Sequence, residues 1–371
     1  MSSKKYIQNL VDRRQRILDG KLNCIPLAFP RLREVYPGIE RRKYNIITSV
    51  QKAGKSKLVD KMMVYEPFFY SIEHPDQLKV SILYFTLEMG KEEKFYEFLC
   101  HLLWKLDKIR CSPTQLKSTD YNKPISQNIL DLINSEKYRE YINKFEKTVE
   151  YIDTIKNPTG IWRYCKDFAE ARGKWHYKEG KIKSGDGFVD GKVLDYFEQN
   201  DPEEYMIVIL DNYANLSSES NMNTKQTIDK MSKYAIELRD KYNFNFTAVQ
   251  HQALETEGLE SRKQNQLEPS SAGLGDAKTS CRDLNTLFGL FSPFKYGIKR
   301  WPDNENGYDI QKFRNHIRFL KICENRDGES GYSTALFFDG AISEFIELPP
   351  ANDTQALEVF YKQIEKINNK K

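Results

Sequence analysis

The residues best suited to chemistry lie in a short segment between a predicted strand and a predicted helix. Residues 49–56 read S-V-Q-K-A-G-K-S and resemble the phosphate-binding pattern G-x-x-x-x-G-K-[ST]. In such a loop, backbone N–H groups and a helix N-terminus bind phosphate oxygens. We therefore expect a nucleotide site made of Ser49, Val50, Gln51, Lys52, Ala53, Gly54, Lys55 and Ser56.

Two side chains of this loop have distinct expected roles. Lys55 would contact the β and γ phosphates, and the hydroxyl of Ser56 would hold Mg²⁺. The pattern departs from its usual form at Ser49, where the first glycine would stand, and that position often needs the backbone freedom of glycine. The alternative is an ordinary strand-to-helix turn that contains Gly-Lys-Ser.

Two carboxylates follow predicted strands and are candidates to complete such a site. Asp211 ends the run Y-M-I-V-I-L-D and would support Mg²⁺. Glu88 ends the run I-L-Y-F-T-L-E and could orient and deprotonate an attacking water. Each has a plainer interpretation, because Asp is common at helix N-caps and turns and Glu is common at the start of surface helices. Position alone does not separate the two interpretations of Glu88.

The elements that would position these groups are strands and helices in alternation. Strand signals occur at residues 43–50, 79–89, 149–154, 205–211, 244–252, 286–291, 317–326 and 332–339. Several are continuous apolar runs, which is typical of strands buried on both faces. Residues 226–241 carry an apolar face at helical spacing. The pattern predicts an α/β fold with a mostly parallel central sheet flanked by helices.

Composition excludes several classes of protein. The chain has 371 residues, 39% of them hydrophobic, and no apolar run of the length that a membrane span needs. Its six cysteines are scattered, and its five histidines share no metal-ligand spacing. The N-terminus has no apolar signal region, so we expect a cytoplasmic protein. A net charge of +4 neither establishes nor excludes nucleic-acid binding.

The chain divides into a core with short flanking segments. Residues 6–19 have the spacing of an amphipathic helix, so residues 1–20 are expected to form an N-terminal linker helix. The core would run over residues 21–348, beginning with a Pro-rich connecting segment. Residues 173–204 are rich in Gly, Lys and aromatic residues and read as an inserted loop or hairpin. Residues 349–371 form a tail with an amphipathic helix.

Taken in order, these motifs resemble the C-terminal ATPase domain of DnaB-type replicative helicases, the superfamily 4 motors with a RecA-like core. The run L-Y-F-T-L-E-M at 83–89 is close to the "FSLEM" segment of that family, and M-I-V-I-L-D-N-Y-A-N-L resembles its "LIVIDYLQLM". The resemblance implies a RecA-like P-loop NTPase fold that uses ATP and Mg²⁺, with Glu88 as the catalytic base. The short form resembles a reduced, phage-encoded version, which would work in the host cytoplasm.

The resemblance also implies roles for residues that spacing alone does not identify. Gln250 or Gln252 would sense the γ-phosphate, with the alignment leaving both open. Arg326 would enter the ATP site of a neighbouring subunit, although Glu324 stands where the family has a lysine. A loop that contains Gly275, Asp276 and Lys278 would contact single-stranded DNA.

The function expected from this resemblance is that of an ATP-dependent DNA helicase. Its partners would be single-stranded DNA, further copies of the chain in a hexamer with the ATP site between subunits, and primase or other replisome proteins. Two alternatives remain open. The first is a RecA-like recombinase or recombination mediator that forms filaments. The second is a degenerate ATPase that serves as a replisome scaffold, which Ser49 and Glu324 would suit.

Overall fold

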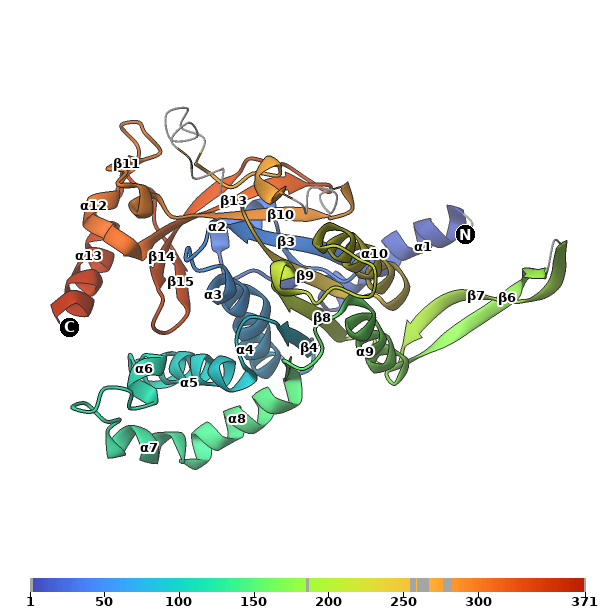
Figure 1. Ribbon diagram of the computed structural model, residues 1–371, viewed down its shortest axis with the longest axis horizontal. Coiled ribbons are helices and arrows are strands. Elements are labelled where there is room, and N and C mark those ends of the chain that lie inside the picture. Colours follow the sequence, from blue (N-terminus) through green and yellow to red (C-terminus); the bar gives the residue numbers. More distant parts are fainter. Residues whose placement is uncertain (1–2, 185–186, 254–257, 259–266, 276–281, 370–371) are drawn as a thin grey trace.

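A nine-stranded sheet forms the centre of the protein (Figure 1). The computed structural model describes residues 3–184, 187–253, 258, 267–275 and 282–369. The strand order across the sheet is β15-β14-β13-β10-β3-β9-β8-β4-β5. In chain order these strands are β3 (Lys43–Ser49), β4 (Lys79–Thr86), β5 (Val149–Ile152), β8 (Glu204–Asp211), β9 (Asn245–His251), β10 (Thr286–Phe291), β13 (Ile317–Asn325), β14 (Ser333–Asp339) and β15 (Glu344–Glu347).

The sheet is mostly parallel, as the sequence predicts. Strands β10, β3, β9, β8, β4 and β5 run parallel to one another. Strands β13, β14 and β15 then extend the sheet in antiparallel pairing. In the parallel part the carboxyl ends of the strands meet at one edge, which is where α/β sheets bind ligands.

Both faces of the sheet are covered by helices, so its central strands alternate between two cores. In β8, Ile207 and Ile209 belong to one apolar cluster. The residues that alternate with them, Met206, Val208 and Leu210, belong to the other. This two-residue period explains why β8 reads as an unbroken apolar run.

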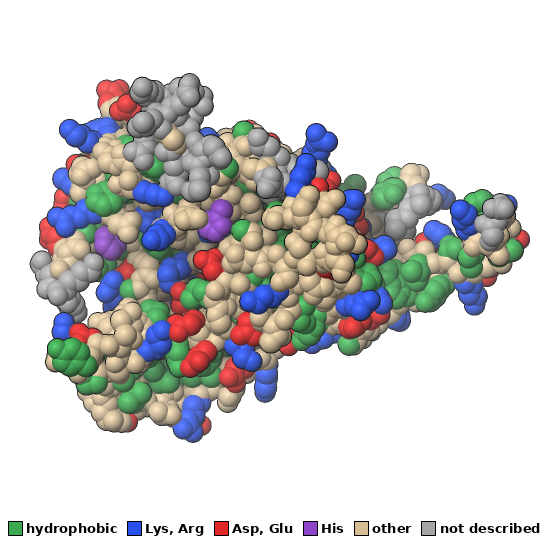
Figure 2. Space-filling model, in the orientation of Figure 1, with side chains coloured by type: hydrophobic (Ala, Val, Ile, Leu, Met, Phe, Trp, Pro, Cys, Tyr) green, Lys and Arg blue, Asp and Glu red, His purple; other side chains and the backbone are tan. Residues whose placement is uncertain are grey.

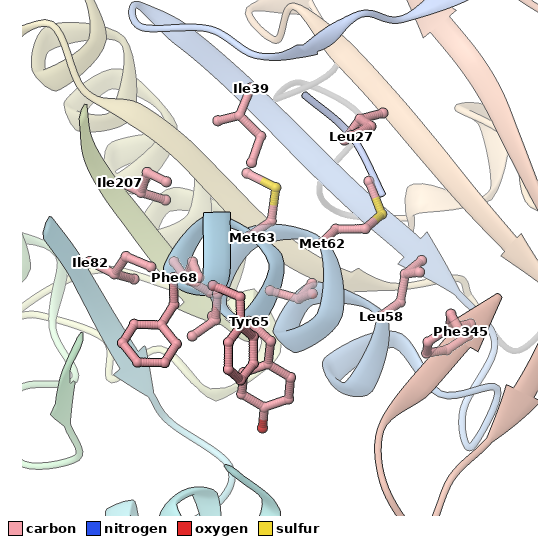
Figure 3. Close-up of a cluster of buried hydrophobic side chains, with 14 of the residues drawn as sticks. Leu27, Ile39, Leu58, Met62, Met63, Tyr65, Phe68, Ile82, Ile207 and Phe345 are labelled. Atoms are coloured by element: carbon pink, nitrogen blue, oxygen red, sulfur yellow. The ribbon is translucent and has the colours of Figure 1, made fainter. Parts of the chain in front are cut away.

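The helices of the first face follow β3 and β4. A continuous helical segment consists of α3 (Lys55–Val59), the π-helical η1 (Asp60–Tyr65) and α4 (Glu66–Glu73). Its side chains Leu58, Met62, Met63 and Phe68 pack into the first core (Figure 3). Four more helices extend this layer: α5 (Lys91–Asp107), α6 (Pro113–Leu116), α7 (Gln127–Ile133) and α8 (Glu136–Thr148).

The opposite face carries two long helices. These are α9 (Pro158–Glu170) and α10 (Thr224–Tyr242). Helix α10 confirms the helix predicted at 226–241, and its Ile228, Met231, Ala235 and Leu238 are buried in the second core. The remaining short elements are β1 (Ile25–Pro26), α2 (Pro30–Val35), β2 (Gly38–Ile39), η2 (Tyr213–Asn215), η5 (Pro293–Tyr296), β11 (Arg300–Trp301), β12 (Tyr308–Asp309), α12 (Ile310–Phe313) and η6 (Arg314–His316).

The segment predicted as an insertion is a long two-stranded ribbon. Strands β6 (Gly173–Ser184) and β7 (Gly187–Gln199) pair only with each other and project from the body of the protein (Figure 1). Hydrophobic side chains lie on the solvent-exposed surface of the ribbon (Figure 2). Tyr177, Phe188 and Leu194 are each more than half exposed.

The two ends of the chain are both helical. Helix α1 (Ser3–Leu18) leaves its apolar residues Ile7, Leu10 and Val11 exposed. Helix α13 (Thr354–Asn369) instead packs Leu357, Ile364 and Ile367 against the antiparallel part of the sheet. None of the helices in the described part of the chain is long and apolar enough to cross a membrane.

Candidate nucleotide-binding site

Two residues of the loop between β3 and α3 have a left-handed backbone conformation. Lys52 and Gly54 adopt positive φ values of 62° and 103°. A Cβ on Gly54 would lie 3.1 Å from Cζ of Phe338, so both conformation and space favour glycine there. Ser49 is the last residue of β3 and has no positive φ. Serine therefore fits its position without backbone strain.

Lys55 lies at the mouth of this loop, in the first turn of α3. The residue is nearly buried, with 5% of its surface exposed. Nζ donates to the carbonyl oxygens of Ser49 (3.3 Å) and Val50 (3.0 Å), and it lies 3.0 Å from Nδ1 of His251. The loop thus folds around a positive charge, which suits the binding of an anion.

A chain of polar contacts runs from Lys55 across the carboxyl ends of three strands. His251 ends β9, and its Nε2 lies 3.3 Å from Nδ2 of Asn212, which follows β8. The same Asn212 amide donates to Oε2 of Glu88, just after β4, at 2.7 Å. The parallel register of β3, β9, β8 and β4 brings these four residues to one edge of the sheet.

His251 is neutral at physiological pH. Partial burial, together with the positive charge of Lys55, lowers the pKa of His251 to about 4. The imidazole is therefore a polar, uncharged group beside the ammonium. Glu88 differs, because its side chain is exposed to solvent at the opening of the site.

Asp211 offers a buried carboxylate at the same edge. It is 4% exposed, and its Oδ2 accepts a hydrogen bond from the Tyr84 hydroxyl at 3.0 Å. Its Oδ1 is buried and has no hydrogen-bond partner among the described residues. An unpaired carboxylate oxygen is costly to bury, and a cation would satisfy it.

The residues therefore fit a magnesium ion. Mg²⁺ is usually held by one or two protein oxygens together with substrate phosphates and water. Asp211 supplies one such oxygen, and the half-buried Ser56 lies in the first turn of α3. In the part of the chain that the structure describes, no group of three or more His, Cys, Asp or Glu side chains could hold a metal. The ion would thus take its other ligands from phosphate and water.

A buried ionic cluster holds the helix after the loop against α5. Nζ of Lys94 lies 2.7 and 2.6 Å from the two carboxylate oxygens of Asp60, and both side chains are fully buried. Glu97 joins Lys94 (3.2 Å) to Lys57 (2.6 Å). Burial opposes the charge of Lys94, but Asp60 and Glu97 outweigh it and raise its pKa. The cluster ties α3 and η1 to the helix that begins three residues after Glu88.

The two glutamines predicted as alternatives for a phosphate sensor lie in different surroundings. Gln252 donates to Oγ1 of Thr48 and to the carbonyl of Ser270, both at 3.0 Å. Gln250 is buried, and its Oε1 has no hydrogen-bond partner among the described residues. The side chain of this strand end that contacts Lys55 is that of His251, whereas the backbone N–H of Gln252 donates to the carbonyl oxygen of Ser49 at 2.9 Å.

Arg326 lies far from the loop within the chain. In register, Thr286 of β10 pairs with both Asn325 of β13 and Asn45 of β3. Arg326 thus follows β13 at the amino end of β3, whereas the loop follows Ser49 at the carboxyl end, roughly 13 Å or more along the strand. The Arg326 side chain is exposed and donates to the carbonyl of Arg282.

The predicted DNA-contacting loop is described only at its start. Gly275 has a positive φ of 57°, and Leu274 before it is buried in the second core. Asp276 and Lys278 lie outside the described residues. The lysine that the family places near the arginine has no counterpart at Glu324, which is exposed, and Lys321 is paired with Glu268 at 2.5 Å.

Sequence reasoning missed the residues that support the site. Asn212 directly follows Asp211, Tyr84 lies four residues before Glu88, and Asp60 and Lys94 stand among other charged residues of helical segments. Tyr84 has one local signal, because it carries a hydroxyl group within the apolar run of residues 82–85. The pairing of Asp60 with Lys94 joins residues 34 positions apart and has no local signature.

Two solved structures share this fold over most of the chain. One is an ATPase domain that aligns with a TM-score of 0.64 at 15% identity, covering 94% of this chain and 100% of that chain. The other, a DnaB-like replicative helicase solved in a study of its interactions with primase, aligns with a TM-score of 0.60 at 16% identity. That alignment covers 91% of this chain and 66% of the helicase chain.

These likenesses establish the fold. The protein has the RecA-like ATPase fold found in DnaB-type helicases, and the resemblance that the sequence motifs indicate is confirmed at the level of three-dimensional structure. No protein-family profile and no curated protein sequence matches the chain.

Proposed function

We propose that this protein is an ATP-dependent motor that moves on single-stranded DNA and separates duplex DNA during replication. The observation that carries the proposal is the meeting of Lys55, Asp211 and Glu88 at one sheet edge, within a fold shared with DnaB-type ATPase domains. A phosphate-binding lysine, a metal-supporting carboxylate and a solvent-facing carboxylate are the groups that phosphoryl transfer to water requires.

The reaction would use these residues in distinct ways. Lys55 and the N–H groups of the loop hold the phosphates of ATP, while Ser56 and Asp211 hold Mg²⁺, which neutralises phosphate charge when bound. Glu88 accepts a proton from the attacking water. His251 contacts both Lys55 and Asn212 and would lie between the phosphates and Glu88, so it is a further candidate for the γ-phosphate sensor beside Gln250 and Gln252.

The proposed site is completed by a second copy of the chain. Arg326 lies at the far end of the sheet from its own loop, so it can stabilise transition-state charge only in a neighbour. We propose a hexamer in which residues 1–20 form a linker segment, residues 21–348 the motor and residues 349–371 a tail. The exposed apolar residues of α1 are available to pack on an adjacent subunit.

DNA and replisome contacts complete the proposal. The loop that includes Gly275, Asp276 and Lys278 would bind single-stranded DNA phosphates, with little dependence on sequence and strong dependence on salt. Primase is a candidate partner because the similar DnaB-like helicase was solved in a study of its interactions with primase.

The decisive assay is ATP hydrolysis with and without single-stranded DNA, using Lys55→Ala as the negative control. We expect hydrolysis that DNA stimulates, and strand separation of a forked duplex. Absence of hydrolysis under both conditions would favour the scaffold alternative. Helical filaments instead of closed rings in electron micrographs would favour the recombinase alternative.

A further inference from the structure

A second positive charge lies beneath the phosphate-binding loop. Arg318 of β13 is 1% exposed. Its guanidinium donates to Ala53 O (2.7 Å), Ile317 O (2.7 Å), Asn315 O (3.0 Å) and Asn315 Oδ1 (2.9 Å). All of these acceptors are neutral, and no carboxylate lies within 4 Å among the described residues.

Such a charge is unusual in a protein interior. Buried charges are normally paired with an opposite charge, because neutral hydrogen bonds replace only part of the lost hydration. Two other deeply buried cations follow that rule, since Lys94 pairs with Asp60 and Lys61 with Glu344. Burial accordingly lowers the pKa of Arg318 to about 9, and the group stays charged at neutral pH.

The bond to Ala53 links Arg318 to the orientation of the loop. The peptide between Ala53 and Gly54 is trans, so its C=O and N–H groups point in opposite directions. Because Arg318 holds the carbonyl from below, the N–H of Gly54 is directed to the other side, away from Arg318. A charged donor on the carbonyl also polarises the peptide and strengthens its N–H as a donor.

Phe338 completes the support. Its ring packs beneath Gly54, where a Cβ would come within 3.1 Å. The Arg318 guanidinium lies 4.6 Å from the centre of the same ring. Strands β13 and β14 are adjacent in the sheet, so both residues approach the loop from the antiparallel part of the molecule.

We propose that Arg318 is a positioning residue of the nucleotide site, which directs the Gly54 N–H towards the phosphates and carries a buried charge that the bound polyphosphate compensates. The inference rests on the proposed nucleotide function. It predicts that Arg318 favours the nucleotide-bound protein over the free protein, and the two states can be measured separately.

The test compares four proteins: wild type, Arg318→Met, Arg318→Gln and Arg318→Lys. Melting temperature is measured without nucleotide and with saturating Mg·ADP, and the Kd of Mg·ADP is measured by calorimetric titration. Arg318→Met removes the charge and the hydrogen-bond donors but keeps a side chain of similar length. Arg318→Gln keeps a donor without the charge, and Arg318→Lys keeps the charge. The control is Arg110→Met, because Arg110 is paired with Asp339 at 2.6 Å, beside Phe338.

Arg318→Met is expected to weaken Mg·ADP binding about tenfold, as loss of charge-assisted contacts does. Its melting temperature without nucleotide is expected to stay close to that of wild type, because the removal of an uncompensated charge is offset by the loss of a donor to buried carbonyl groups. The rise in melting temperature caused by Mg·ADP should shrink. The Kd of Mg·ADP for Arg318→Gln should lie between the values for Arg318→Met and wild type. For Arg318→Lys it should come within about threefold of the wild-type value.

The Arg110→Met control is expected to melt at a lower temperature than wild type, because Asp339 loses its ion-pair partner. Its Kd for Mg·ADP should be unchanged, because the loop is not altered. An unchanged Kd in both the Met and the Gln variants would overturn the inference, and if their melting temperatures also fell, Arg318 would have a structural role alone. If Arg318→Met protein fails to fold, the same comparison of Kd is made between Arg318→Gln, Arg318→Lys and wild type, and an unchanged Kd for Arg318→Gln would overturn the inference. Failure of wild type itself to bind Mg·ADP would instead overturn the proposed function, and this inference with it.

Discussion

The two ends of the parallel sheet are built very differently. At the carboxyl end, Lys55, His251, Asn212 and Glu88 form a continuous chain of contacts of 2.7 to 3.3 Å that joins one helix and three strand ends. At the amino end, Arg326 is exposed, and its side chain donates to a backbone carbonyl. One end holds a connected set of reactive groups, whereas Arg326 at the other end is exposed to solvent.

The difference indicates how a shared active site can be divided. The groups that bind and activate must be held with respect to one another, so they are fixed by buried contacts such as the Asp60–Lys94 pair. A residue that acts in a neighbour must reach outward, so it cannot be buried in its own subunit. Changes at the first end should affect binding, chemistry and stability, whereas changes at the second should affect only the assembled enzyme.

The largest effect is expected from Lys55→Ala. Removing the ammonium takes away a charge-assisted contact to the β and γ phosphates, so hydrolysis should fall by at least about 10²–10³-fold and nucleotide binding should weaken. Circular dichroism would check that the fold is retained. Normal turnover by this variant would mean that ATP binds elsewhere.

Glu88→Gln should separate chemistry from binding. The amide has nearly the same shape but cannot accept the proton of water, so turnover should drop about 10²-fold while the Kd for ATP is retained. Glu92→Gln, on the first turn of α5, is the matched control and should hydrolyse ATP normally. Equal rates in the two variants would make Glu88 a surface residue.

Asp60→Asn tests whether the carboxyl end depends on its buried ions. The change leaves Lys94 buried with one partner fewer, and breaking such a pair costs about 3–5 kcal/mol of unfolding free energy. Arg326→Ala should leave the unfolding free energy essentially unchanged, because Arg326 is exposed. Chemical denaturation of both variants measures the contrast, and similar losses would remove the distinction between the two ends.

The smallest effect is expected from Tyr84→Phe. Burial raises the pKa of Tyr84 well above its usual range, so the phenol stays protonated and donates to Asp211. Without that bond the carboxylate is less well oriented, and the Mg²⁺ concentration needed for half-maximal hydrolysis should rise by up to about tenfold.

Tyr151→Phe is the matched control for Tyr84→Phe. The two rings lie 5.3 Å apart, and the Tyr151 hydroxyl has no hydrogen-bond partner among the described residues. Its Mg²⁺ dependence should match that of wild type. Identical curves for both variants would mean that the Tyr84 hydroxyl does not support Asp211.

The carboxyl end could be predicted from sequence to a large degree because its signals are local. Gly54, Lys55 and Ser56 closely follow the apolar strand in sequence. Asp211 and Glu88 also stand at the ends of apolar strands, which predicts that they lie at the carboxyl edge of the sheet. Serine at position 49 causes no backbone strain, since the residue belongs to the strand and has no positive φ.

Other features have no local signal. Whether Gln250, His251 or Gln252 faces the loop depends on where β9 ends, and one residue of register reverses the answer. The helices α5 to α8 were not foreseen, and the contact of Arg318 with Ala53 spans 265 positions. Pairings of that kind arise from packing in the folded chain.

The most direct test of the account is a mixing experiment. Lys55→Ala protein retains Arg326, and Arg326→Ala protein retains Lys55, so each alone should be nearly inactive. Mixed assemblies would contain interfaces with an intact loop on one side and an intact arginine on the other. We predict that ATP hydrolysis partly returns on mixing and depends on protein concentration. No recovery, with co-assembly demonstrated, would contradict an active site shared between copies of the chain.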